Sequence, residues 1–197
     1  MKIYDISQEI FSCEVYPGDP VPTSQVLSSI GKGDLYNLTA FSMCAHNGTH
    51  VDAPFHFINE GKTIDKMPLE AFIGSACVAE HNGEMTAQDA YKIIIQAYNA
   101  KGEPIKRILI KGNSTVTLDA AKVFSEAGIC LLGVESQSVG PIDAPMAVHK
   151  ELLGNEIVLL EGLRLDNVPE GVYLLNAAPL NLSGSDGAPC RAVLIDF

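Results

Sequence analysis

The segment from His46 to His56 constrains this chain more than any other part of its sequence. It reads HNGTHVDAPFH and places His46, His50, Asp52 and His56 within eleven residues. These four residues have the same parity, so a continuous strand would project their side chains from one face. Six residues of extended chain would nevertheless separate His46 from Asp52 by roughly 20 Å, too far for two ligands of one ion whose bonds are about 2 Å long. The chain must therefore bend between them.

Asn47 and Gly48 provide that bend. Glycine accepts positive φ and asparagine tolerates it, whereas Thr49, Val51 and Pro54 disfavour a helix through the same stretch. Three imidazoles and a carboxylate form a donor set that suits a borderline divalent ion such as Zn²⁺ or Mn²⁺. The segment therefore predicts a turn that gathers its own metal ligands.

The overall composition predicts one globular domain, spanning 1–197. The chain is 47% hydrophobic and 19% charged, which is too apolar for a disordered protein. Its formal net charge of −11 repels nucleic acid and anionic membrane surfaces, so neither is expected as a partner. The N-terminal segment carries charges, and no apolar run approaches the 18 or so residues that span a bilayer. We therefore expect a cytoplasmic protein.

The five cysteines are predicted to be free thiols. Their number is odd, they are widely spaced, and no C-x-x-C pair is present. Cys44 lies two residues before His46, so a soft metal ligand at this position stays open as an alternative to a buried strand residue.

The pattern of apolar residues and turn signals predicts a mixed α/β fold with two or three helices. Helices are expected at 86–100, with Thr86 as the N-cap and Gly102 after the end, at 118–127, stopped by Gly128, and at 147–153. Strands are expected within 1–10 and at 35–44, 107–111, 129–134, 157–160, 171–175 and 192–195. A helix between the strands 107–111 and 129–134 predicts a βαβ crossover, and therefore a sheet that is partly parallel.

The histidine segment resembles a known family. It meets every fixed position of the H-x-G-T-H-x-D-x-P-x-H signature of the cyclase superfamily, to which bacterial kynurenine formamidases and isatin hydrolases belong. Weaker matches follow at Asp5-Ile6-Ser7, at Pro17-Gly18-Asp19, at Gly133-Val134-Glu135 with Ser138, and from Asp186 to Val193. The resemblance implies the swivelling β/β/α fold of the cyclase-like superfamily and a homo-oligomer, a dimer or a tetramer.

The resemblance also implies a second pair of metal ligands. The family has a His and a Glu twelve residues apart, and His149 and Glu161 have this spacing. By resemblance, His46, His50 and Asp52 would hold one ion, Asp52 would bridge, and His149 with Glu161 would complete a second site, giving up to two ions per subunit. His56 would stay free of metal as the acid/base. Without the family spacing, His149 would be interpreted as a histidine on a helix surface. His81 has no such support and is predicted to be a solvated turn residue.

A metal site with open coordination predicts hydrolysis. A divalent ion lowers the pKa of bound water and polarises a carbonyl, so metal-bound hydroxide would attack an amide carbonyl while His56 passes a proton to the departing nitrogen. The resemblance makes an aryl formamide of the N-formylkynurenine type the expected substrate. A lactam such as isatin or another cyclic amide or ester is the alternative, and a non-catalytic metal-binding protein is the alternative from another class.

Two departures from the family pattern bear on the substrate. The chain has no Trp, and Tyr16 stands where kynurenine formamidases place a Trp before Pro-Gly-Asp. Tyr16 is therefore a candidate for stacking on a substrate ring, with an ordinary loop aromatic as the alternative. Glu135 stands where relatives commonly have Asp, which would shift any carboxylate contact. Phe55, Phe57 and Phe72 are further pocket candidates, although such residues are more often part of the core.

Overall fold

A nine-stranded mixed sheet forms the centre of the computed structural model, which describes residues 1–197. The strands lie in the order β1 (Lys2–Asp5), β13 (Val193–Asp196), β11 (Gly171–Asn176), β5 (Ile73–Glu80), β7 (Arg107–Lys111), β9 (Leu131–Val134), β10 (Val158–Glu161), β4 (His50–Asp52) and β12 (Gly187–Pro189). The four central strands β5, β7, β9 and β10 pair in parallel, and the strands on both sides of them pair antiparallel. The predicted mixed α/β class is confirmed.

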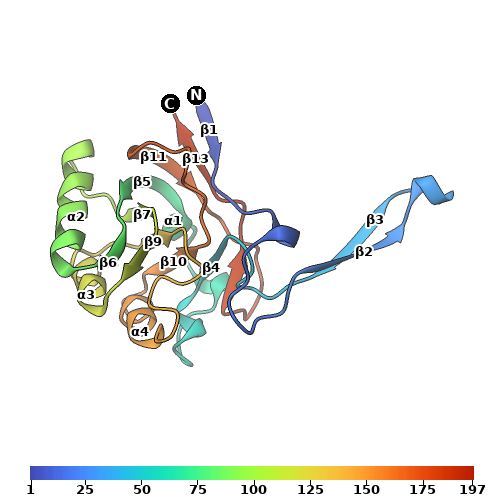
Figure 1. The fold of residues 1–197 in the computed structure, drawn as a ribbon, viewed down its shortest axis with the longest axis horizontal. Coiled ribbons are helices and arrows are strands. Elements are labelled where there is room, and N and C mark those ends of the chain that lie inside the picture. Colours follow the sequence, from blue (N-terminus) through green and yellow to red (C-terminus); the bar gives the residue numbers. More distant parts are fainter.

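Three helices connect the parallel strands and cover one face of the sheet (Figure 1). They are α2 (Ala87–Lys101), α3 (Leu118–Glu126) and α4 (Met146–Gly154). Their positions confirm the three predicted helices, and α3 confirms the crossover between β7 and β9. Helix α2 begins at a capping box of Thr86 and Asp89 and ends at Gly102, whose φ of 76° is the left-handed conformation that glycine adopts readily.

The alternation of side chains along the central strands builds two cores. On β7, Ile108 and Ile110 pack with the helices, whereas Leu109 points to the opposite face. The opposite core includes Val51 of β4 and Leu160 of β10, where the sheet curls over itself. Every residue of β4 and β10 is buried, so whatever these strands carry is removed from water.

An arm projects from this body (Figure 1). It comprises residues 21–43, in which β2 (Thr23–Ser28) and β3 (Leu38–Ser42) pair antiparallel with each other and with no other strand. The strand predicted at 35–44 is confirmed as β3. Strand β2 was not predicted, because the sequence TSQVLS has little apolar alternation.

The remaining elements are short. They are α1 (Leu69–Phe72), the parallel pair β6 (Gly83–Met85) and β8 (Ser114–Val116), and single 3-10 turns at Ile10–Ser12, Ile30–Lys32, Pro54–His56 and Ile64–Lys66. No helix is both long enough and apolar enough to cross a bilayer.

Gly133 of β9 provides a test of how tightly the core packs around the central strands. A Cβ atom at this position would lie 2.5 Å from Leu109 Cδ2 and 3.0 Å from Leu163 Cδ1. We expect Gly133→Ala to lower the free energy of unfolding by about 1–3 kcal/mol, measured by urea unfolding of chelator-treated protein. Gly31→Ala is the matched control, because its nearest neighbour would be Ser29 Oγ at 3.6 Å. Equal unfolding free energies for the two variants would contradict this account of the packing.

Candidate metal centre

The pairing of β4 with its two neighbours brings distant parts of the sequence together. His50 of β4 lies opposite Glu161 of β10 in the antiparallel register. On the other edge of β4, Gly187 of β12 lies opposite Asp52. The histidine segment, the end of β10 and the segment around residue 186 therefore meet at one place, although more than a hundred residues separate the histidine segment from the other two.

The turn before β4 has the predicted bend. Gly48 has a φ of 66°, and the Asn47 side chain accepts a hydrogen bond from the backbone N–H of Cys44 at 2.9 Å. The same side chain donates to the Pro20 carbonyl at 3.2 Å. The bend places His46 Nδ1 2.8 Å from Asp52 Oδ1, although the two residues are six positions apart in sequence.

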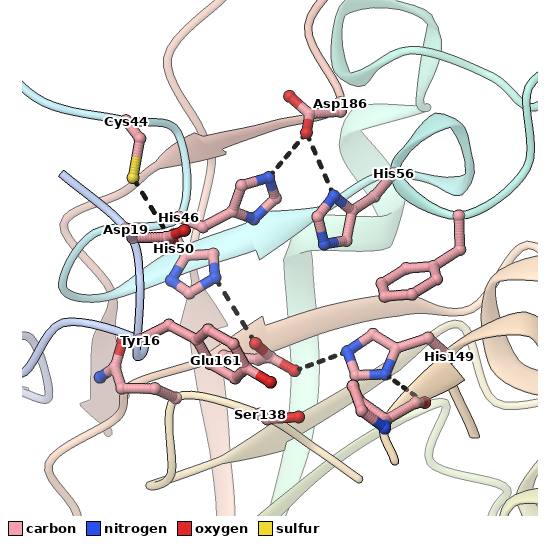
Figure 2. Close-up of a pocket in the computed structure, with 13 residues that line it drawn as sticks. Tyr16, Asp19, Cys44, His46, His50, His56, Ser138, His149, Glu161 and Asp186 are labelled. Atoms are coloured by element: carbon pink, nitrogen blue, oxygen red, sulfur yellow. Dashed lines mark hydrogen bonds and ion pairs between the residues drawn. The ribbon is translucent and has the colours of Figure 1, made fainter. Parts of the chain in front are cut away.

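Five predicted ligands form one cluster in which Asp52 is shared. Figure 2 shows the other four, His46, His50, His149 and Glu161, around the pocket. Donor atoms of His46, His50 and Asp52 lie within 4.8 Å of one another, as do those of Asp52, His149 and Glu161. The His149 Nε2 atom is 3.3 Å from Glu161 Oε1 and 3.8 Å from Asp52 Oδ2. This arrangement, two donor groups joined by one carboxylate, is the one that the family resemblance implies.

Hydrogen bonds orient the two most buried histidines toward the cluster. His50 Nδ1 lies 2.9 Å from the Gly48 carbonyl and His149 Nδ1 lies 2.8 Å from the Pro145 carbonyl, so each Nδ1 donates. Each Nε2 is then the atom left to face the carboxylates. A ligand histidine is commonly held in this way by a carbonyl on its other nitrogen.

One carboxylate oxygen of the cluster has no hydrogen-bond partner. Glu161 Oε1 accepts the backbone N–H of Val139 at 2.7 Å, but Asp52 Oδ2 is buried with no hydrogen-bond partner. An unpaired buried carboxylate oxygen is costly. Its position between the two donor groups, together with the imidazole and carboxylate donors around it, fits a divalent cation.

The ionisable groups of the cluster shift one another's pKa strongly. Burial alone would lower the pKa of His46, but hydrogen bonds to Asp186 and Asp52 outweigh it and raise the pKa to about 10. The pKa of His50 is likewise raised to about 10, because Asp52 and Glu161 outweigh the effect of burial. Burial would raise the pKa of Asp52, yet the two histidines hold it well below its usual value. In the absence of metal, protons on the imidazoles balance the buried carboxylates.

His56 lies beside this cluster but is more accessible than its members. Its ring stacks on that of His46 with centroids 4.0 Å apart, and 27% of its side chain is exposed. Its Nδ1 atom is 3.1 Å from Asp186 Oδ2, which also lies 2.9 Å from His46 Nε2. Asp186 lies 40% exposed at the mouth of the site, and its contacts with the two histidines hold its pKa well below the usual value.

Asp186 is the site residue that the sequence reasoning did not identify as functional. It belongs to one of the weaker family matches, and its role depends on the pairing of β12 with β4, which no local pattern encodes. Gly187, the residue after Asp186, is one sign in the sequence that this segment lies close to the site. A Cβ at Gly187 would lie 2.8 Å from His46 Cε1, so only glycine leaves room for that imidazole.

A cavity of about 410 Å³ opens onto the cluster. Tyr16 and Phe57 line it, and the Tyr16 hydroxyl donates to the Ile142 carbonyl at 2.7 Å. Phe57 packs against the His149 ring with centroids 4.6 Å apart. Phe72 is instead part of the core. Two further lining groups, the Gln137 amide and the Ser138 hydroxyl, are buried without hydrogen-bond partners.

Three other residues considered from the sequence lie outside the donor cluster. The Glu135 carboxylate accepts backbone N–H groups of Gly112 at 2.6 Å and Leu165 at 2.7 Å, so it joins two loops. His81 contacts Ser114 Oγ at 2.8 Å near the start of β6. Cys44 lines the cavity, with its sulfur 3.8 Å from Asp19 Oδ2, but it is not part of either donor group.

The geometry predicts that metal content depends on His149 and not on His81. We expect His149→Ala to reduce bound metal after dialysis, because it removes one donor and one of the two imidazoles that face Glu161. His81→Ala, the matched control, should keep the metal content of the unaltered protein. Inductively coupled plasma mass spectrometry measures both, and equal metal content in the two variants would contradict the assignment.

This chain is similar in sequence to a family of known proteins. Residues 4–141 match the cyclase family, described as "Putative cyclase". A kynurenine formamidase from Bacillus anthracis is 33% identical over 207 residues, covering 98% of this chain and 97% of that enzyme. A kynurenine formamidase from Salinibacter ruber is 34% identical over 212 residues, covering 100% of this chain and 98% of that enzyme.

Solved structures share the fold. A protein described as a "predicted metal-dependent hydrolase" from Bacillus stearothermophilus is 28% identical, has a TM-score of 0.79, and is matched over 98% of this chain and 97% of its own. Isatin hydrolase A from Labrenzia aggregata has a TM-score of 0.83 over 100% of this chain and 94% of its own, at 22% identity, which shows likeness of fold. The family match and the relatives that cover the full length agree: this chain belongs to the cyclase family.

Proposed function

We propose that this protein is a metal-dependent amide hydrolase whose substrate is an aryl formamide of the N-formylkynurenine type. The observation that carries the proposal is the Asp52 carboxylate, shared by two donor groups and unpaired at Oδ2, beside a cavity that also exposes His56. The full-length relatives named kynurenine formamidase support the choice of substrate.

The metal would be held by the five clustered side chains, His46, His50, Asp52, His149 and Glu161. Their nitrogen and oxygen donors suit Zn²⁺ or Mn²⁺, and the two groups could hold up to two ions. A bound divalent ion supplies a Lewis acid that polarises a carbonyl and makes water more acidic. Burial of the donors, with Asp52 only 1% exposed, would strengthen such electrostatic effects.

His56 is suited to move a proton between the reacting groups and the leaving nitrogen. With its Nδ1 directed at Asp186, the Nε2 atom is the one left for substrate. The Asp186 carboxylate would hold the imidazole in that tautomer and in that orientation. The stacked His46 ring restricts its rotation. His56 would therefore be the catalytic acid/base and Asp186 its positioning residue.

The cavity wall supplies contacts for the rest of the substrate. Tyr16 and Phe57 offer aromatic surfaces for an aryl ring, and the Tyr16 bond to Ile142 fixes its hydroxyl. The unpartnered Gln137 amide and Ser138 hydroxyl would be satisfied by polar groups of a bound molecule. An aromatic ring with polar substituents therefore matches this wall.

Three wider expectations belong to the same proposal. Residues 1–197 would act as a single domain, the protein would work in the cytoplasm, and it would be a homo-oligomer. The net charge of −11 and the small cavity support a small-molecule substrate in preference to nucleic acid or membrane.

Turnover of N-formyl-L-kynurenine by metal-loaded protein tests the function. We expect formate release that is lost on chelation and restored by adding Zn²⁺ or Mn²⁺. His56→Ala should lower kcat by about 10²–10⁴-fold, because it removes the proton-transfer group, while metal content stays unchanged. A coupled formate assay and metal analysis measure the two effects.

The same assay separates the alternatives. If isatin is hydrolysed and the formamide is not, the protein is a metal-dependent hydrolase whose substrate is a lactam. No turnover of either compound by protein with bound metal would count against an enzyme and favour a metal-binding role, for which His56 is not needed.

Asp186→Asn tests the role assigned to that residue. The amide can present either its oxygen or its NH₂ group to His56 Nδ1, so it no longer fixes one tautomer of the imidazole, and we expect kcat to fall about 10–100-fold with KM little changed. Asp186→Glu should recover part of the loss. Steady-state kinetics over a range of pH measure both variants, and a kcat equal to that of the unaltered protein would show that Asp186 does not position His56.

A further inference from the structure

A third group of donor atoms lies beside the two groups that share Asp52. It comprises His46, His56 and Asp186, whose donor atoms lie within 4.8 Å of one another. Both imidazoles face the same oxygen, Asp186 Oδ2, from His46 Nε2 at 2.9 Å and from His56 Nδ1 at 3.1 Å (Figure 2). We call these three residues the outer donor group. Two imidazoles and a carboxylate are donor types that bind a borderline divalent ion such as Zn²⁺.

The spacing of the outer donor group is close to that of a metal site. Two ligand atoms that each lie about 2.1 Å from a tetrahedral ion are roughly 3.4 Å from one another. The two nitrogen-to-oxygen distances of the group, 2.9 and 3.1 Å, are slightly shorter than this. A widening of roughly 0.3–0.5 Å, which small side-chain rotations provide, therefore makes room for an ion.

Backbone hydrogen bonds hold His56 and Asp186 in place relative to each other. The Ala53 N–H donates to the Asp186 carbonyl at 2.8 Å, and the His56 N–H donates to the Ala53 carbonyl at 2.9 Å. The turn that carries His56 and the segment that leads into β12 are therefore joined through Ala53. Because the two donors are preorganised in this way, an ion that binds between them orders little additional chain.

The outer donor group is open to solvent, unlike the buried cluster. The side chains of Asp186, His56 and His46 are 40%, 27% and 15% exposed, whereas that of Asp52 is 1% exposed. All three residues of the group line the 410 Å³ cavity. An ion held by the group can therefore complete its coordination with water and exchange with the solution.

His46 belongs both to the buried cluster and to the outer donor group. Its Nδ1 atom lies 2.8 Å from Asp52 Oδ1, on the side of the cluster. A neutral His46 that gives Nδ1 to an ion of the cluster keeps its proton on Nε2. His56 and Asp186 are then the two strong donors of the outer group. An ion in the outer group is therefore bound more weakly than an ion in the cluster.

We propose that the outer donor group is an additional binding site for a divalent cation, with Zn²⁺ as the best match, and that an ion bound there inhibits hydrolysis. The binding of the ion does not depend on which substrate the protein hydrolyses. The inhibition rests on the proposed function, because it acts through His56 as the acid/base.

Inhibition follows from the tautomer that the ion imposes on His56. A neutral imidazole that coordinates an ion through Nδ1 carries its proton on Nε2, the atom left for substrate. The proton moves from Nδ1 to Nε2, so none is gained or lost overall. Nε2 then has no free lone pair with which to accept a proton. The same ion occupies the Asp186 carboxylate, which otherwise holds the opposite tautomer.

Zinc binding at equilibrium tests the site. Dialysis against rising free Zn²⁺, with bound metal measured by inductively coupled plasma mass spectrometry, should show a tight phase for the cluster and a weaker phase for the outer group. Asp186→Asn and His56→Ala should each lose the weaker phase and keep the tight one, because each removes a strong donor. Asp19→Asn is the matched control, since Asp19 lines the same cavity but belongs to none of the donor groups. This control should keep both phases.

Turnover over the same range of free Zn²⁺ tests the inhibition. In the unaltered protein, filling the weaker phase should lower kcat about 10²-fold or more, the loss expected when proton transfer by His56 is removed. The residual turnover of His56→Ala should not fall further over that range, because the variant has neither the weaker phase nor the imidazole on which the ion acts.

The two measurements can fail separately. Equal zinc content in the unaltered protein and in Asp186→Asn and His56→Ala, with both variants folded by circular dichroism, would overturn the site, as would loss of the weaker phase in Asp19→Asn. A weaker phase that fills without lowering turnover would overturn the inhibition. Absence of any turnover would count against the proposed function and the inhibition together, while the zinc content of the variants would still decide whether the outer donor group binds an ion.

Discussion

The burial of two ionised carboxylates is the constraint on which the rest of this structure depends. Asp52 and Glu161 lie inside the sheet, where an unpaired carboxylate would be prohibitively expensive. The antiparallel register of β4 with β10 solves the problem, because it places His50 opposite Glu161 and allows His149 to reach both acids. Three features bring imidazoles to these buried carboxylates: the position of β4, the bend at Gly48 and the orientation of α4.

Those parts of the fold that rest on local chemistry were predictable from the sequence. The capping box and the glycine after α2, the amphipathic spacing of α3 and the β-rich strand β7 all act within a few residues. Strand β5 was not predicted, although it lies near the middle of the sheet. Its sequence IGSACVAE contains Gly, Ser and Ala, which have little strand propensity, and it becomes a strand because β7 and β11 pair with both of its edges.

The site shows the same division between local and distant information. The bend and the approach of His46 to Asp52 followed from Asn47, Gly48 and the distance that an extended chain would impose. The pair His149 and Glu161 could be identified only through the family spacing. Asp186 was missed because β12 brings it to the site across more than a hundred residues, and the role of Glu135 in joining two loops depends equally on tertiary structure.

The arm and the site are continuous along the chain. Tyr16 and Asp19 lie just before the arm and Cys44 just after it, and all three line the cavity. The Asn47 side chain ties both ends together through its bonds with Cys44 and Pro20. A displacement of the base of the arm would therefore also move these three residues in the wall of the cavity.

The location of β4 between β10 and β12 has a consequence for the newly made chain. Both neighbours of β4 follow it by more than a hundred residues, so a ribosome synthesises the histidine segment long before either edge of that strand can be paired. Helices α2 and α3 and strands β5, β7 and β9 can assemble in the meantime, because their contacts are close in sequence. All five donor residues are present only once Glu161 has been made, so this part of the scaffold can form before the donor cluster does.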